Sequence, residues 1–243
     1  MSITRTASAL HKWLALLLAV PILFWFGSGL FFAAVPIEWV RSEHRVAEIP
    51  ARPIEMTAAA AGLARLAALG VTSADKVELR TLLDRPVALV SGGAGRPKLF
   101  DLRSGRLVSP ISARMAVAIA ARDEAGSARP VRVAAVAANS PEYRGALPAW
   151  RVDFSDGAGV ARYVAADTGL VSARRSTLWR VYDFLWSLHI LDLRDHEDFN
   201  TPVLILAALL ALLVLVSGIV LLPQRLGWQR LYRRFRRPNR SGG

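Results

Sequence analysis

The sequence predicts an α+β protein in which two transmembrane helices flank a domain of two similar units, each a helix followed by an antiparallel sheet. Two long runs without a charged residue, at 13–37 and 199–224, indicate the membrane helices. Residues 38–198, between the two runs, alternate helical and strand-like patterns with turns. The chain has 243 residues and no cysteine, which excludes disulfides, thiolate metal sites and cysteine nucleophiles.

The two uncharged runs have the length that a membrane requires. At about 1.5 Å per residue, either run crosses a hydrocarbon core of roughly 30 Å. We therefore expect transmembrane helices over residues 13–37 and 200–222. The first run is too long for the apolar part of a signal peptide, and residues 31–35 do not place small residues at the −3 and −1 positions of a plausible cleavage site. A retained anchor is the better interpretation.

The charges predict the orientation. Residues 1–12 contain two basic residues and no acid, and residues 223–243 contain seven arginines and no acid. All 19 acidic residues lie between the two runs. By the positive-inside rule both termini face the cytoplasm and residues 38–199 face outward. The arginine-rich tail also contains aromatic residues, but because it directly follows a membrane helix we expect it to bind anionic lipid rather than nucleic acid.

Alternation and turn residues place the elements of the intervening domain. Residues 56–69 form an alanine-rich helical stretch that Thr57 can cap and Gly70 can end, and residues 112–122 form a second one. Turns are expected at Asp84-Arg85-Pro86 and at Gly92-Gly93. β-Branched or alternating runs predict strands at 76–82, 87–91, 97–102, 131–136, 150–154 and 160–164.

The two halves of this domain end alike. Residues 100–109 and residues 164–172 each combine a strand, a polar turn with glycine and a strand that resumes on apolar residues. The two stretches are about 64 residues apart, which indicates a repeated unit. We expect repeat 1 over residues 38–110 and repeat 2 over residues 111–176.

The strand that ends in Asp167-Thr168-Gly169-Leu170-Val171 resembles the closing strand of PepSY repeats. The segment that opens with His11-Lys12-Trp13-Leu14 and ends near Gly27-Ser28-Gly29-Leu30 resembles the PepSY-associated transmembrane helix. The stretch from Leu188-His189 to Ser217-Gly218 is similar to the following helix of that family.

The resemblance implies a bacterial inner-membrane protein with a periplasmic PepSY region. Larger relatives with four membrane helices include iron-regulated proteins and haem-containing reductases that act on ferric siderophores. This chain has two such runs. The segment between the domain and the second run, residues 177–199, is rich in aromatic residues and is expected to lie at the membrane interface.

Four histidines are the candidate haem ligands. His11 and His189 match the family motifs and are the candidate ligands of haem b, and His44 and His196 are candidate second ligands. If both helices span, His11 and His189 lie roughly 30 Å apart and cannot share one haem within a chain. The alternatives are two His11 side chains in a homodimer, or His189 with His44 or His196. Without haem, His11 and His189 are ordinary interfacial residues.

Four residues close to the second run, Asp192, Asp195, His196 and Asp198, are candidate ligands of a metal ion. In a helix, Asp192 and His196 would be neighbours. The competing interpretation is a helix start, with acids near its N-terminus, Asn200 or Thr201 as the cap and Pro202 in the first position.

Small residues punctuate both membrane runs, at Gly27-Ser28-Gly29 and at Ser217-Gly218. Because the two groups lie at different depths, we expect each to pack on bulky residues of the other helix, on a second copy or on a protein partner. The serines lack a G-x-S-x-G context, and no catalytic constellation is apparent.

Three hypotheses follow. The chain is a non-enzymatic, membrane-anchored periplasmic binding or accessory module, a haem-bearing electron-transfer or ferric-siderophore reductase component, or an envelope metal-binding protein. The first requires only the anchors and the duplicated domain.

Overall fold

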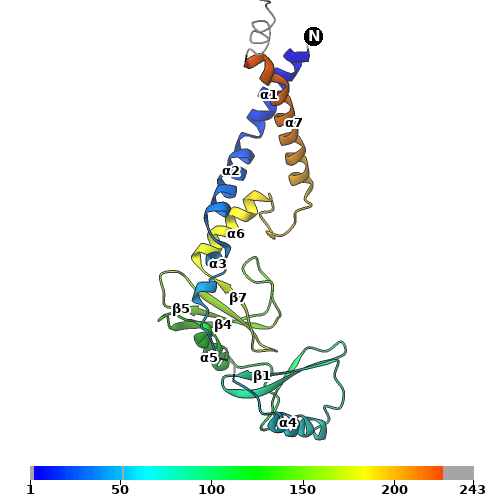
Figure 1. Cartoon of the computed structure of the whole chain (residues 1–243), viewed down its shortest axis with the longest axis vertical. Helices are drawn as coiled ribbons and strands as arrows, with labels where there is room; N and C mark the ends of the chain where they lie inside the picture. Colours follow the sequence, from blue (N-terminus) through cyan, green and yellow to red (C-terminus); the bar gives the residue numbers. More distant parts are fainter. Residues whose placement is uncertain (1–2, 51, 227–243) are drawn as a thin grey trace, which may run out of the picture. The chain divides into compact units, whose positions relative to one another are not determined.

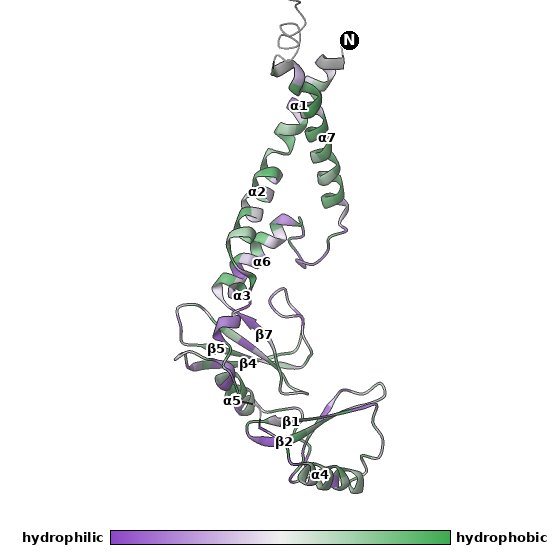
Figure 2. Ribbon diagram, viewed as in Figure 1, coloured by the Kyte–Doolittle hydropathy of each residue, from purple (hydrophilic) through white to green (hydrophobic). Residues whose placement is uncertain are grey.

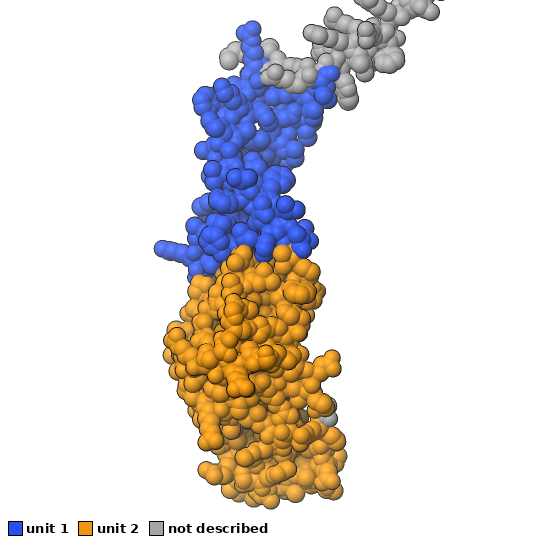
Figure 3. Space-filling model, turned by 90° about the vertical axis from the view of Figure 1, so that its left-hand side faces the viewer, with its two compact units in different colours: residues 1–34, 184–243 blue, residues 35–183 orange. Residues whose placement is uncertain are grey.

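The computed structural model describes residues 3–50 and 52–226 (Figure 1). The chain divides into two compact units. Unit 1 comprises residues 1–34 and 184–243, and unit 2 comprises residues 35–183 (Figure 3). The predicted basic tail, from residue 227 onward, lies outside the described residues.

Unit 1 consists mainly of three helices, α1 (Ile3–Leu17), α2 (Ala19–Ala34) and α7 (Pro202–Arg225), and α2 and α7 are the more apolar of them (Figure 2). Residues 202–223 of α7 are long and apolar enough to cross a membrane. Thr201 caps this helix, because its Oγ1 accepts a hydrogen bond from the Leu204 amide at 3.2 Å, and Pro202 occupies the first helical position. The predicted start of α7 is confirmed.

The first apolar run is not one straight helix. α1 already begins at Ile3, and α1 and α2 are bent by 63° at a break around Leu18. Pro21 explains the break, because it lacks the amide that would bond to the carbonyl of Leu17 and its ring crowds that carbonyl. The pair satisfies the length and composition of a span only when both helices are taken together. The transmembrane helix expected over residues 13–37 therefore stays a prediction.

Unit 2 begins with two short helices, α3 (Ile37–Val40) and η1 (Glu43–Arg45), and its next helix is α4 (Met56–Ala68). The first sheet has the antiparallel order β1-β2-β3, with β1 at Lys76–Leu82, β2 at Arg85–Ser91 and β3 at Lys98–Asp101. α4 packs on one face of this sheet, where Leu66 joins Ala88, Phe100 and Leu102 in a small core.

The second sheet has the antiparallel order β4-β5-β6-β7 and follows α5 (Ala113–Asp123). Its strands are β4 (Pro130–Val136), β5 (Ala149–Phe154), β6 (Ala161–Ala165) and β7 (Val171–Arg175). Ser112 caps α5 by accepting the Met115 amide at 3.3 Å. The α+β class with two antiparallel sheets is thereby confirmed.

A single core joins the two halves of unit 2. It includes Leu89 and Leu99 of the first sheet, Ile119 of α5, and Val152 and Val164 of the second sheet. Side chains alternate along a strand, so one face of the first sheet faces α4 and the other contributes to this shared core. Neither half buries its apolar surface alone.

Two details of the predicted elements were wrong. Leu83 and Asp84, both at positive φ, make the tight turn between β1 and β2, whereas Arg85 and Pro86 already belong to β2. Thr57 lies inside α4, whose N-cap is Glu55 without a side-chain hydrogen bond. Gly70, with φ 92°, ends that helix as expected.

The similar stretches of the two halves fold alike. The Gly105 amide donates to the Asp101 carbonyl at 2.7 Å, and the Gly169 amide donates to the Ala165 carbonyl at the same distance. Both glycines have positive φ, 73° and 68°. The Asp101 amide donates to the Arg106 carbonyl at 3.0 Å, and the Ala165 amide donates to the Leu170 carbonyl at 2.9 Å. The turns are therefore equivalent, and the duplication of whole units stays a prediction.

Candidate functional sites

His11 lies in α1 and contacts α7. Its Nδ1 is 3.0 Å from the Val214 carbonyl oxygen and 3.1 Å from Ser217 Oγ. A Cβ added at Gly218 would lie 3.2 Å from His11 Cε1. The pair Ser217-Gly218 thus provides a hydrogen-bond partner and the space for the imidazole, as expected for a small-residue contact with a bulky residue.

His189 ends α6 (Thr177–His189) and contacts α2. Its Nδ1 is 2.7 Å from Ser28 Oγ, and its backbone carbonyl accepts the Trp25 indole N–H at 2.7 Å. The ring packs edge-on against Phe32 at a centroid distance of 5.6 Å and stacks on Trp186 at 6.4 Å. This half-buried polar contact lies within an aromatic cluster.

The two histidines make the same kind of contact, because the Nδ1 of each lies within hydrogen-bond distance of a serine hydroxyl. Nε2 is therefore the nitrogen left for any further ligand. Such Nδ1 contacts are typical of metal-ligating histidines but equally of structural ones. The structure does not bring the two rings together. His11 lies in α1 and Ser28, the partner of His189, lies in α2, roughly 25 Å away when measured along the two bent helices at 1.5 Å per residue. One haem cannot take both as axial ligands within a chain.

The other two histidines lie elsewhere. His44 belongs to unit 2 and stacks on Trp39 at a centroid distance of 4.6 Å. His196 lies in the loop before α7, at φ 60°. Residues 190–201 contain no helix, so the expected helical pairing of His196 with Asp192 was wrong. The physical reason is visible in the hydrogen bonds of Asp192.

The carboxylate of Asp192 organises this loop. It accepts the backbone amides of Arg194 and Asp195 at 3.1 and 3.2 Å on Oδ1, and those of Glu197 and Asp198 at 3.0 and 3.1 Å on Oδ2. The amides of Asp198 and Glu197 stabilise the ionised form most and hold the pKa of Asp192 far below its usual range. Within residues 3–50 and 52–226, no group of three His, Asp or Glu side chains is arranged to hold a metal ion.

Unit 2 contains a hollow of about 550 Å³, the size of a ligand cleft. It is lined by residues 79–84 of β1 and its turn, by residues 169–171 and Arg174 at β7, by part of α5 and by residues near Ile49 and Ile54. Its lining combines apolar side chains with Thr81 and six charged residues, Arg52, Arg80, Arg122, Arg174, Asp84 and Asp123.

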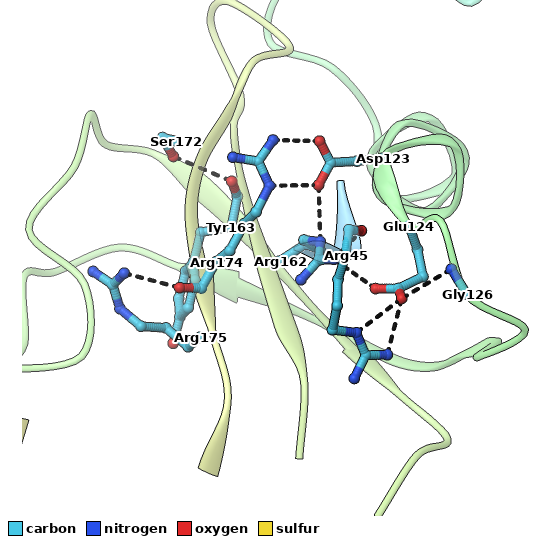
Figure 4. A network of polar contacts seen from close by, with 9 residues as sticks. All are labelled: Arg45, Asp123, Glu124, Gly126, Arg162, Tyr163, Ser172, Arg174 and Arg175. Atoms are coloured by element: carbon cyan, nitrogen blue, oxygen red, sulfur yellow. Dashed lines mark hydrogen bonds and ion pairs between the residues drawn. The ribbon is translucent and has the colours of Figure 1, made fainter. Parts of the chain in front are cut away.

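A buried network of charges lies beside this hollow (Figure 4). Arg162 of β6 is fully buried, with Nε 2.8 Å from Asp123 Oδ2 and Nη2 2.5 Å from Glu124 Oε2. Glu124 also accepts both Arg45 Nε and Nη2, at 3.0 and 2.9 Å, and Asp123 also binds Arg174. Burial lowers the pKa of Arg162, and the attraction of Glu124 and Asp123 opposes this.

Sequence analysis did not single out Arg80 or Arg162. The signal in the sequence was an arginine within a strand whose other residues are apolar or alternate between apolar and polar. The two strands are KVELRTL, with Arg80, and ARYVA, with Arg162. Arginine is rarely buried without a partner, so such a position indicates an ion pair or a ligand.

These features define a membrane-associated α+β protein with a two-sheet unit. The model of the PepSY-associated TM region matches residues 8–242, and the chain belongs to this family. Searches of curated proteins and of solved structures found no significant match.

Proposed function

We propose that the chain is a membrane-anchored periplasmic PepSY module that binds a protein or peptide partner and assists an envelope or membrane complex, without being an enzyme itself. The hollow of unit 2 carries the proposal, because a cleft of about 550 Å³ with apolar walls and arginines suits a bound segment of a partner. The apolar helix α7 in the same chain suits an anchor.

The charge distribution supports the inner membrane, with both termini in the cytoplasm and residues 38–199 in the periplasm. The helices also leave room for a second copy or a membrane partner. A Cβ added at Gly27 or Gly29 would meet nothing within 4 Å. The haem and metal hypotheses receive less support, because His11 and His189 contact separate helices and Asp192 binds backbone amides.

Single cysteines test the proposal cleanly, because the chain has none of its own. Thr6→Cys probes the N-terminus, Leu170→Cys the rim of the hollow, and Asn139→Cys an exposed site that does not line it. In intact cells with a permeabilised outer membrane, an impermeant maleimide should label Leu170→Cys and Asn139→Cys but not Thr6→Cys.

The same variants then report the partner. Coupled to a benzophenone maleimide and irradiated in membranes, Leu170→Cys should give a discrete cross-linked species that Asn139→Cys lacks. Labelling of Thr6→Cys from outside would contradict the orientation. Identical cross-linking patterns at both periplasmic positions would contradict a partner in the hollow.

A further inference from the structure

Two sheet edges border the hollow. β1 is an edge strand of the first sheet, and β7 is an edge strand of the second. Residues of both strands line the hollow, Leu79 to Leu82 from β1 and Val171 with Arg174 from β7. An edge strand pairs its backbone groups on one side only and is a ready template for another extended strand.

The charges around the hollow are unevenly compensated. Asp84 is shared by Arg52, at 3.0 Å, and Arg122, at 2.9 Å. Asp123 is shared by Arg174 and the buried Arg162. The lining therefore contains four arginines and only two carboxylates. One of these carboxylates, Asp123, also pairs with Arg162, which does not line the hollow. The hollow carries excess positive charge.

Arg80 is the source of this excess. Within the described part of the chain it forms no ion pair; its Nη2 donates to the Thr168 carbonyl, and its buried Nε has no hydrogen-bond partner. The acid next to it on the same face of β1, Glu78, is held by Lys76 at 3.1 Å. Burial lowers the pKa of Arg80, and Glu78 opposes this only partly. A half-buried guanidinium without a carboxylate favours an anionic ligand.

We infer that the hollow binds an extended acidic peptide segment, which adds as a strand along the edge of β1 or β7 and places a carboxylate against the guanidinium of Arg80. The inference rests on the proposed function and names the chemistry of its partner. Apolar side chains such as Leu82, Ile119 and Leu170 would receive the alternate residues of the segment.

Three features favour a peptide over a lipid headgroup or a free anion. The free strand edges offer hydrogen bonds to a main chain, which neither alternative supplies. The apolar walls match alternating side chains. The single uncompensated arginine fits one carboxylate, whereas a polyanionic surface would be met by several exposed basic residues.

The test uses the full chain in nanodiscs of zwitterionic lipid and a fluorescein-labelled peptide of alternating valine and glutamate. Fluorescence anisotropy should show saturable binding that a peptide with glutamine in place of glutamate lacks. Arg80→Gln should weaken binding by about tenfold, because one charge-assisted contact is lost. Arg132→Gln, on the exposed face of β4, should bind like the wild type.

Leu170→Glu is a second variant whose folding is not at risk, because this side chain is 48% exposed. It places a carboxylate at the rim and should also weaken binding. The inference is overturned if the acidic peptide does not bind, if the glutamine peptide binds equally, or if vesicles of anionic lipid bind at the hollow and the peptide does not. Cross-linking at Leu170→Cys in cells without binding of the acidic peptide would refute the peptide chemistry and leave the proposed function intact.

Discussion

Each half of unit 2 combines a helix with an antiparallel sheet, of three strands in the first half and four in the second, but different interactions hold the helix to its sheet. In the first half, α4 approaches Leu102, just after β3, so closely that a Cβ added at Gly62 would lie 2.9 Å from the Leu102 carbonyl oxygen. The buried residues of the local core are Leu66, Ala88, Phe100 and Leu102. In the second half, the C-terminal end of α5 is tied to β6 and β7 by buried ion pairs. A helix can thus be fixed to its sheet either by close approach of the backbones or by charge.

The difference has consequences for sensitivity to mutation. A contact fixed by close approach fails when volume is added, whereas a buried charge network fails when one charge is removed. The two halves should therefore respond to opposite kinds of substitution, although both contribute to one shared core.

The largest effect is expected for Arg162→Met. The substitution leaves Asp123 and Glu124 buried without their central cation, and breaking a buried network of this kind costs about 3–5 kcal/mol of unfolding free energy. Urea unfolding of the purified chain, with hydrogen exchange at β6, measures it. Arg96→Met, whose side chain is 70% exposed and 3.9 Å from Asp167, is the control and should change little. A loss no larger than that of the control would show that the network contributes little.

The next largest effect is expected for Gly62→Ala, which should destabilise the protein although alanine normally has a higher helix propensity than glycine. Alanine favours an exposed helix over glycine by about 1 kcal/mol, yet here a Cβ would lie 2.9 Å from the Leu102 carbonyl oxygen and from its Cβ. Because a backbone atom cannot move aside cheaply, we expect a loss of about 2 kcal/mol through overpacking. Ala60→Gly, on the exposed side of α4, should lose about 1 kcal/mol by propensity alone. Stabilisation by Gly62→Ala would show that the close approach is not required.

The comparison also shows what sequence alone could predict. Strand 76–82, the Ser112 start of α5 and the Thr201-Pro202 start of α7 follow from local patterns, because alternation and capping depend on neighbouring residues. The equivalent turns at Gly105 and Gly169 were predictable for the same reason.

The interactions between distant residues were not predictable. Ser28 with His189 and Arg162 with Glu124 are far apart in the chain and depend on how the helices and strands meet. The acidic run 192–198 was compatible with both a metal site and a helix start, because composition does not reveal that one carboxylate, Asp192, accepts four backbone amides. Arg80 gave a signal only as a lone charge within a strand.

A smaller loss of stability, equal in the two halves of unit 2, is expected when the glycine of either turn is replaced by alanine. Gly105→Ala and Gly169→Ala each force an L side chain into the left-handed region, at about 1–2 kcal/mol. Both added Cβ atoms would also approach side-chain ends, Leu69 Cδ1 at 2.8 Å and Leu82 Cδ2 at 3.1 Å, which can adjust. Thermal unfolding of both variants measures the losses. Values that differ by more than a factor of two would argue against equivalent turns.

The smallest expected effect is a difference between the two turns in how their stability depends on pH. In the first turn the carboxylate of Asp101 accepts the amides of Arg103 and Ser104, both at 2.9 Å, whereas the equivalent residue of the second turn is Ala165. Burial opposes ionisation, but the hydrogen bonds from Ser104 and Arg103 outweigh it and lower the pKa of Asp101.

A depressed carboxyl pKa stabilises the fold above the unfolded value of about 3.9, and this contribution is lost as the pH falls through the lower folded pKa. Hydrogen exchange of residues 102–107, corrected for intrinsic rates, should therefore lose protection on acidification from pH 6 to pH 3. Residues 166–171 should keep theirs, and Asp101→Asn should remove the difference in pH response between the turns. Parallel loss of protection in both turns would mean that acid acts on the shared core and not on Asp101. The two turns would then be alike in sensitivity as well as in geometry.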